Sequence, residues 1–408
     1  MSNYFKNIAR LLTGNVIAQL IAFLGSIVIP LYYTPEQVGE LGIIVSVISI
    51  LSIIITLRLD TYLLAVNNRV LKPAVKYVIQ VILIQSIILS CILLLCGDYI
   101  NNQLSYTFSY GEYVFMLICA ILTSITFVYN SLLCRLEKFN KVAAANVIRS
   151  IVLSLCQVLF GIFSILKGLW YPQFLSRIFQ VFYLVRKENV FDGLNTEKYD
   201  KGTFLRESKP FVTFTFLSSL VVTLSTYIPV ILIPQNLSVQ DSGIYFFTIQ
   251  IIITPVSMIV QSISKVFSVE FIKHSSTNSI RLFYKTFLSL LILGGLYYFA
   301  SIPIIKHFSF LVPIEWRSIL DIADLVVLYS VAILAVSSVS QVFNLVNGQK
   351  LLFISECIKL ALVLFVFYNI DSSTVNLRNI TIDITRAAFV GYTIQFVLML
   401  VCLRRYRG

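Results

Sequence analysis

The feature that most constrains this chain is a series of apolar segments, each about 20 residues long, that repeats from one end to the other. A helix of about 20 residues spans the ~30 Å hydrocarbon layer of a bilayer, because each residue rises ~1.5 Å. Hydrophobic residues make up 58% of the 408 residues and charged residues only 12%. A water-soluble protein of this composition could not cover its core with polar surface. The sequence therefore predicts an all-α membrane protein.

The apolar segments divide into about twelve predicted transmembrane helices. They are continuously apolar and do not alternate, which argues against a β-barrel. The predicted helices span residues 11–33, 38–57, 75–96, 112–134, 142–166, 168–185, 211–233, 243–264, 282–301, 324–346, 351–369 and 383–402. The first run follows Lys6 and Arg10 and is too long for the core of a signal peptide, so we expect it to be a retained helix.

The distribution of lysine and arginine predicts the orientation of these helices. With the N-terminus in the cytoplasm, the inner loops hold the great majority of the basic residues. The outer loops then hold Lys167, Lys306, Arg317 and Arg378. The positive-inside rule is satisfied by this orientation and violated by its inverse. We therefore expect a multi-pass protein of the inner (cytoplasmic) membrane with both termini in the cytoplasm.

The sequence also indicates an internal duplication. The segment from Pro30 to Gly39 aligns without gaps on the segment from Pro234 to Gly243, at an offset equal to half the chain length. The identity is weak, but each segment closes the first helix of its half and opens the second. We expect an N-terminal lobe at 1–186, a polar cytoplasmic linker at 187–210 and a C-terminal lobe at 211–408. The two six-helix lobes would be related by a pseudo-two-fold axis along the membrane normal.

Several other classes of site are not expected. The seven cysteines lie within or beside apolar segments and show no zinc-ligand spacing, and the two histidines, His274 and His307, lie far apart. We therefore predict no metal site, disulfide framework or Ser/His/Asp triad. The net charge of +12 is spread over separate loops and does not form one basic patch, so no nucleic-acid partner is expected.

Four stretches resemble a known family. They are Tyr33-Thr-Pro-Glu-Gln-Val-Gly-Glu-Leu-Gly42, Leu57-Arg-Leu-Asp-Thr-Tyr-Leu-Leu64, residues 243–267 with Pro255 and Gln261, and Glu315-Trp316 together with Gln341-Val-Phe-Asn344 and Gly348-Gln-Lys350. With these stretches the chain resembles polysaccharide exporters of the multidrug/oligosaccharidyl-lipid/polysaccharide (MOP) superfamily, and most of all flippases of lipid-linked O-antigen units (Wzx-type). Asp60 stands where the family more often has glutamate.

The resemblance implies a two-lobed bundle that opens alternately to either face of the membrane. Its implied cargo is an undecaprenyl-diphosphate-linked oligosaccharide, moved from the cytoplasmic to the periplasmic leaflet. The implied partners are this lipid-linked substrate, the bilayer and other polysaccharide-assembly proteins. We expect no cofactor, and the sequence leaves open whether transport is coupled to protons or sodium.

Charged residues inside the predicted helices or close to their ends are the candidate functional residues. A cation at the bilayer centre is costly unless it meets water, a partner or a ligand. A positively charged cavity suits diphosphate, which guanidinium groups bind in a bidentate manner. The candidate substrate-binding residues are Arg58, Asp60, Arg149, Arg177, Lys265 and Lys359, and the candidates for ion coupling are Asp60, Glu270 and Glu356.

Each candidate has a structural alternative. Arg58 and Asp60 are two residues apart, so they meet only through a break in the helix or a partner helix. Glu356 and Lys359 have i,i+3 spacing and can simply neutralise each other. Lys265 lies near the inner end of its helix and can snorkel to the interface. We interpret Arg386, near an outer helix end, as structural.

Three other functions compete with that of a flippase. An ion-coupled drug antiporter of the MATE type should have an acidic cavity, whereas basic residues dominate here. A membrane polysaccharide polymerase or ligase needs a large outer loop for its catalytic residues, and the longest outer loop predicted, at 302–323, is short. A transporter of the major facilitator type should carry a glycine- and arginine-rich signature, which residues 67–76 lack.

Overall fold

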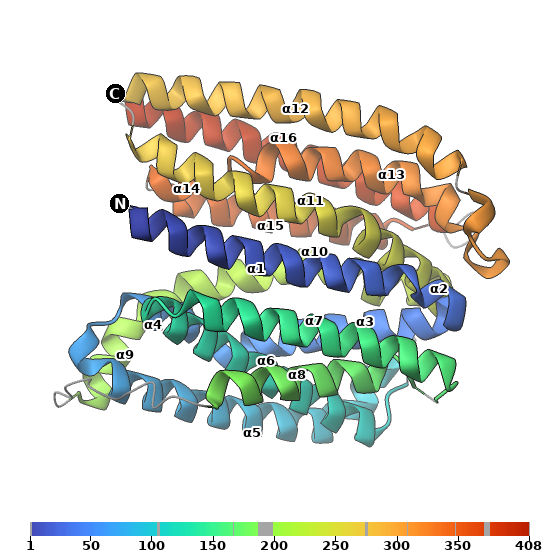
Figure 1. The fold of residues 1–408 in the computed structure, drawn as a ribbon, viewed down its shortest axis with the longest axis horizontal. Helices are drawn as coiled ribbons and strands as arrows, with labels where there is room; N and C mark the ends of the chain where they lie inside the picture. The colour runs from blue at the N-terminus through green and yellow to red at the C-terminus, as the bar shows by residue number, and fades with distance from the viewer. Residues whose placement is uncertain are drawn as a thin grey trace. The chain divides into compact units, whose positions relative to one another are not determined.

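The computed structural model describes residues 2–103, 107–165, 167–186, 199–273, 276–307, 309–346, 348–370 and 376–407. Within these ranges the chain is helical and forms no strand (Figure 1). Eleven of the described helical segments are long and apolar enough to cross a membrane. The remaining predicted span, 168–185, is the 16-residue helix α8 (Trp170–Val185). The predicted all-α membrane fold is thus confirmed.

The chain divides into two compact units. The N-unit comprises residues 1–32 and 43–224, and the C-unit comprises residues 33–42 and 225–408. The boundary therefore falls within helix α10 (Phe216–Asn236), and the turn at residues 33–42 joins the C-unit. Of the predicted linker, residues 187–198 lie outside the described part of the chain, while 201–210 form helix α9 (Lys201–Pro210).

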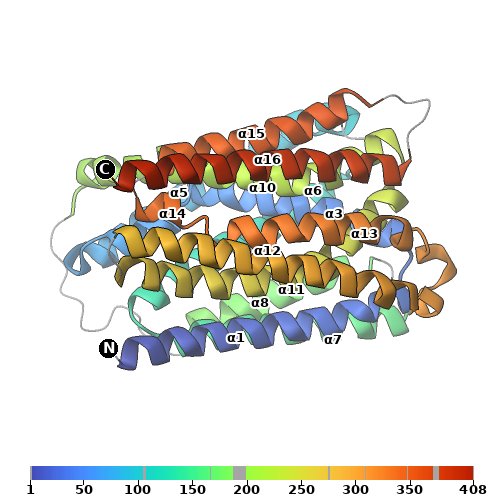
Figure 2. The ribbon, with the colours of Figure 1, turned by 90° about the horizontal axis from the view of Figure 1, so that it is seen from above.

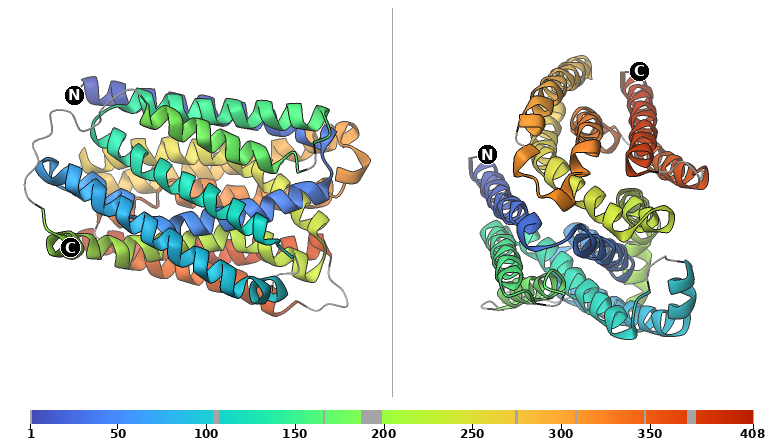
Figure 3. Two further views of the ribbon diagram at one scale, coloured as in Figure 1. Left: turned by 90° about the horizontal axis from the view of Figure 1, so that it is seen from below. Right: turned by 90° about the vertical axis from the view of Figure 1, so that its right-hand side faces the viewer.

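The N-unit is built around α7 (Phe139–Ile162), which packs along both α1 (Ser2–Ile27) and α8 (Figure 3, left). The close approach of α1 to α7 depends on glycine. Gly14 lies against Ala143 and Gly25 against Ser154, with no room for a Cβ on either glycine. Small residues are what allow membrane helices to pack this closely. Helix α6 (Tyr110–Arg135) packs against α4 (Leu59–Ala65), α5 (Leu71–Gln103) and α8.

In the C-unit, α16 (Leu377–Arg407) packs against α15 (Gln349–Tyr368) and α13 (Ile319–Ala332) (Figure 2). Helices α11 (Val239–Lys273) and α12 (Ser276–His307) pack against α13, as the end-on view shows (Figure 3, right). Near the C-terminal end of α16, stacked aromatic rings fill the interior, with the rings of Phe287 and Phe396 4.2 Å apart. Short helical segments at Val342–Leu345 (α14) and Ile314–Trp316 complete the unit.

The two turns that the sequence alignment pairs contact each other reciprocally. The helix boundaries agree with the offset, since α2 (Ile29–Tyr32) and α10 end at aligned residues and α3 (Pro35–Thr56) and α11 begin at aligned residues. Gly39 lies against the Val239 carbonyl group and Gly243 against the Pro35 carbonyl group, and neither glycine has room for a Cβ. Val239 is the counterpart of Pro35, and Gly243 is that of Gly39. A reciprocal contact of this kind is what a local two-fold axis produces.

The helix caps repeat in the same register. The Gln37 N–H donates to Oγ1 of Thr34 (3.3 Å) at the start of α3, and the Asp241 N–H donates to Oγ of Ser238 (3.1 Å) at the start of α11. Both are N-caps that satisfy a backbone donor of the first turn. Matching caps at matching positions support the internal duplication that the sequence predicted.

Candidate functional site

Arg177 occupies the middle of α8, and its side chain is buried, with 5% exposed. Its Nε donates to Oγ1 of Thr123 on α6 (2.9 Å), and its Nη1 donates to the main-chain oxygen (2.6 Å) and Oε1 (2.8 Å) of Gln173. Three uncharged oxygen atoms from two helices therefore hold the guanidinium in place. An ionised side chain buried among apolar membrane helices is costly and is by default a candidate functional group.

A chain of amide side chains lies beside Arg177 on the same face of α8. Gln180 donates from Nε2 to Oδ1 of Asn146 (2.8 Å), and Asn146 donates from Nδ2 to Oδ1 of Asn15 (2.8 Å), which links α8, α7 and α1. Arg149, half-buried, follows Asn146 by one turn on α7. The sequence singled out Arg149 and Arg177 but not Gln173 or Gln180. Their spacing of four and three residues around Arg177 is the helical stripe that could have revealed them.

Arg58 and Asp60 meet at a break between helices. Helix α3 ends at Thr56 and α4 begins at Leu59, and the intervening Leu57 and Arg58 have positive φ angles of 45° and 56°. Residues with a Cβ rarely adopt this conformation. The break brings Nη1 of Arg58 within 3.6 Å of Oδ2 of Asp60. Residues two apart in a continuous helix do not face each other, so this contact depends on the break. Burial raises the pKa of the Asp60 carboxyl group above its ordinary value, and the neighbouring Arg58 opposes that shift.

Close to Asp60, a cluster that the sequence did not predict docks α9 onto the N-unit. The hydroxyl groups of Tyr62 and Tyr199 lie 2.6 Å apart, and both donate to Oε2 of Glu207, at 3.1 and 2.6 Å. Burial raises the pKa of Tyr62 to about 12. Phe204, 2% exposed, stacks on Tyr77 with ring centroids 5.1 Å apart. Helix α9 is therefore an anchored element of the N-unit.

Phe204→Ala is expected to lower the free energy of unfolding by about 3 kcal/mol, because it removes a fully buried ring from between Tyr62 and Tyr77. Thermal unfolding of the purified protein in detergent measures this loss. Leu205→Ala is the matched control, since Leu205 is its neighbour on α9 and is 54% exposed. If both variants lost the same stability, the docking of α9 would be disproved.

In the C-unit, Lys359 and Glu356 form a buried ion pair on α15. Nζ of Lys359 lies 2.8 Å from Oε1 of Glu356, and the two side chains are 14% and 8% exposed. Gln395 on α16 accepts from Lys359 (3.3 Å) and donates to Glu356 (3.2 Å), and the Tyr392 ring centroid lies 4.7 Å from Nζ. The i,i+3 neutralisation that the sequence offered as an alternative for Lys359 is therefore the arrangement in the structure.

Lys359 and Arg149 occupy matching places on their helices. Each lies ten residues after the first residue of its helix, Phe139 for α7 and Gln349 for α15. The space for the Lys359 side chain comes from Gly391 on α16, where a Cβ would lie 2.5 Å from Cγ of Lys359. Gly391 thus lets α16 approach α15 beside the ion pair.

Tyr392 also lines a cavity of about 180 Å³. Tyr245, Tyr329 and Tyr392 line it together with Ser225 and Thr226, and aliphatic side chains complete its wall. The Tyr329 and Tyr392 rings lie 6.3 Å apart. The cavity therefore combines hydroxyl groups and aromatic faces within the membrane spans, which suits a polar ligand with apolar ring faces.

The remaining predicted residues lie on α11 and α16. Lys265 is exposed on α11, and Glu270, five residues later, is half-buried. Arg386, interpreted as structural from the sequence, is exposed on α16 and pairs with Asp383 at 3.2 Å. Among the described residues, no group of three or more histidine, cysteine, aspartate or glutamate side chains could hold a metal ion.

The fold is that of the MATE-like membrane transporters. An inward-facing multidrug resistance MATE family transporter of the MOP superfamily has a TM-score of 0.63 and 11% identity, over 97% of this chain and 95% of that one. An outward-facing MATE family transporter gives 0.60 and 14%, over 98% and 96%. A MOP superfamily transporter from Pyrococcus furiosus, for which reverse polarity of the binding pocket suggests a different function, gives 0.59 and 13%, over 99% and 96%.

The sequence identifies the family within this fold class. Residues 4–268, more than half of the chain, match the polysaccharide biosynthesis protein family, and the chain belongs to that family. No curated protein matches the sequence. The fold and the family together support a multi-pass membrane transporter, in agreement with the class that the sequence resemblance indicated.

Proposed function

We propose that this protein is a flippase that moves an undecaprenyl-diphosphate-linked oligosaccharide across the inner membrane by alternating access. Membership of the polysaccharide biosynthesis family supports the cargo class. The observation that carries the proposal is the position of Arg177, a guanidinium buried at the middle of the apolar helix α8 and oriented by Gln173 and Thr123. Guanidinium groups match the geometry and charge of a diphosphate.

Other polar groups of the N-unit and the C-unit would contact the sugars of this cargo. The prenyl chain stays in the lipid while the diphosphate and sugars pass through the protein. Asn146 and Gln180 offer amide hydrogen bonds to sugar hydroxyl groups beside Arg177, and Tyr245 and Tyr329 offer hydroxyl groups and aromatic faces in the C-unit. Coupling to protons or sodium through Asp60, Glu270 or Glu356 remains part of the proposal.

Arg177→Ala is expected to reduce surface polysaccharide at least about tenfold, which corresponds to the loss of one charge-assisted hydrogen bond. Arg177→Lys should restore part of the export, because it keeps the charge but not the bidentate geometry. The measurement is surface polysaccharide in a strain that lacks the chromosomal gene, at matched protein level. Arg317→Ala, at an exposed arginine outside the spans, is the control. Undiminished polysaccharide in Arg177→Ala would overturn the role of Arg177.

A second candidate function is an ion-coupled small-molecule antiporter of the MATE type, favoured by the likeness of the fold to multidrug transporters. The basic residues in the spans favour the flippase, because cationic drugs need acidic partners. For the Pyrococcus furiosus transporter, which has a similar fold, reverse polarity of the binding pocket suggests a different function. Loss of drug resistance with intact polysaccharide in a deletion strain would favour the antiporter.

A further inference from the structure

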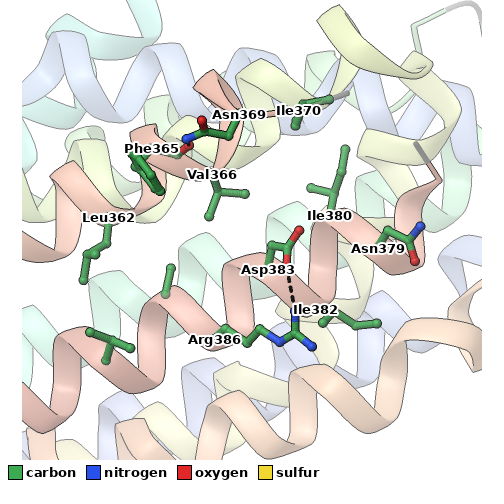
Figure 4. A pocket seen from close by; sticks show the side chains of 12 residues that line it. Leu362, Phe365, Val366, Asn369, Ile370, Asn379, Ile380, Ile382, Asp383 and Arg386 are labelled. Atoms are coloured by element: carbon green, nitrogen blue, oxygen red, sulfur yellow. Dashed lines mark hydrogen bonds and ion pairs between the residues drawn. The ribbon is translucent and has the colours of Figure 1, made fainter. Parts of the chain in front are cut away.

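A groove of about 620 Å³ runs between α15 and α16, near the last residues of α15 and the first residues of α16 (Figure 4). Its floor is formed by the buried Ile380 and Ala387 of α16. Apolar side chains line the sides, among them Leu362, Phe365 and Val390, and the latter two are 64% and 49% exposed. The groove lies within the C-unit and includes none of the substrate-binding candidates predicted from the sequence.

Both signs of charge border this groove. Asp383 and Arg386 lie one turn apart on α16, and Nη1 of Arg386 donates to Oδ1 of Asp383 at 3.2 Å (Figure 4). Their side chains remain largely exposed, at 53% for Asp383 and 75% for Arg386. The pair uses one of the five N–H groups of the guanidinium. The amide side chains of Asn369 and Asn379 lie in the same lining.

The groove lies at the depth of lipid head groups and upper acyl chains. Helix α16 has 31 residues and is therefore ~46 Å long, which exceeds the ~30 Å hydrocarbon layer. Asp383 and Arg386 fall in its first ten residues, near one boundary of that layer. Tyr368 at the end of α15, 87% exposed, is an aromatic residue of the kind that marks this boundary. In the predicted topology the leaflet concerned is the outer one.

We propose that this groove binds a phospholipid whose head group carries both a phosphate and a primary amine, as in phosphatidylethanolamine. An acyl chain lies along Leu362, Phe365 and Val390, the phosphate accepts from Arg386, and the ammonium group donates to Asp383. The charge pattern favours this occupant. A head group with phosphate alone would place its negative charge beside Asp383, whereas a zwitterionic head group satisfies both members of the pair.

Native mass spectrometry of the purified full-length protein tests this proposal, with phosphatidylethanolamine and phosphatidylglycerol of identical acyl chains offered in equal amounts. We expect the unchanged protein to retain phosphatidylethanolamine several-fold more than phosphatidylglycerol. Arg386→Gln should lower retention of phosphatidylethanolamine about tenfold, the effect of losing one charge-assisted hydrogen bond. Asp383→Asn should remove the preference between the two lipids.

Arg378→Gln is the matched control. Arg378 lies on the first turns of α16, donates to the Asp321 main-chain oxygen and pairs with Asp324 at 3.4 Å, outside the groove lining. Val390→Trp, at an exposed wall position, should block the acyl chain and lower retention of both lipids. The proposal is overturned if Arg386→Gln and Asp383→Asn retain lipids as Arg378→Gln does, or if the unchanged protein shows no preference. Lipid retention is measured without transport, so the result is independent of the proposed flippase function.

Discussion

Gly243→Ala is expected to lower the free energy of unfolding by about 3 kcal/mol or more. A Cβ at this position would overlap the Pro35 main-chain oxygen and lie 2.6 Å from the Gly39 nitrogen. Both are backbone atoms, which no change of rotamer can move. In a helix alanine is otherwise favoured over glycine by ~1 kcal/mol, so the predicted loss is opposite in sign to helix propensity. Thermal unfolding in detergent, together with the yield of folded protein, measures the effect.

Gly295→Ala on α12 is the control, because a Cβ at Gly295 would meet no atom within 4 Å. Its stability should stay within about 1 kcal/mol of that of the unchanged protein. Because the contact is reciprocal, Gly39→Ala should be as damaging as Gly243→Ala, and the double variant should lose less than the two losses added together. Equal stability of Gly243→Ala and Gly295→Ala would contradict the close packing of the two paired turns.

Lys359→Met is expected to cost about 3–5 kcal/mol of stability, since it leaves the buried Glu356 carboxylate without its cation. Methionine has a side-chain volume similar to that of lysine. The loss of stability therefore measures the removal of the charge and not the creation of a cavity. The further change Glu356→Gln should recover most of the stability, because a neutral glutamine beside Gln395 no longer needs a counter-charge. Thermal unfolding of both variants, with Cys357→Ala on the same helix as control, measures the pair.

The same variants separate a structural role of the ion pair from a transport role. If the double variant regains stability and also exports polysaccharide, the pair only stabilises the C-unit. If it regains stability but does not export, Glu356 or Lys359 takes part in transport. A Lys359→Met variant as stable as the unchanged protein would show that the buried pair is not formed.

The sequence predicts the helices of this fold well because the bilayer constrains the composition of each membrane-spanning segment. Each span must be apolar over a fixed length, so each predicted segment falls on a helix of the structure, although α1 begins nine residues before its predicted segment and α11 ends nine residues after its own. The duplication was also visible, since Pro30 and Gly39 recur as Pro234 and Gly243. The division of the chain into two units was harder to predict from the sequence. The turn at 33–42 joins the C-unit through contacts such as the hydrogen bond from Trp316 Nε1 to the main-chain oxygen of Tyr33. Contacts between residues so distant in the sequence cannot be predicted from a local sequence pattern.

The candidate site could be predicted only in part. An arginine in an apolar run, such as Arg177, is visible in the sequence, and so is the i,i+3 pair of Glu356 and Lys359. The groups that orient them come from helices distant in the sequence, as Thr123 does for Arg177 and Gln395 for Lys359. In a span that is apolar on all sides, the sequence does not show which face of the helix packs against which other helix. The residues that contact Arg177 and Lys359 can therefore be identified only from the folded structure.

The most direct test of the proposed function is translocation by the purified protein in liposomes. Undecaprenyl-diphosphate-linked oligosaccharide is placed in both leaflets, and the fraction accessible to an added glycosidase is followed with time. The unchanged protein should expose the inner pool at a rate well above that of protein-free liposomes, and Arg177→Gln should reduce this rate at least about tenfold while Arg317→Gln leaves it unchanged. A rate equal to that of protein-free liposomes, or an equal rate for unchanged protein and Arg177→Gln, would contradict the proposal that a buried guanidinium in this fold serves a diphosphate-linked cargo.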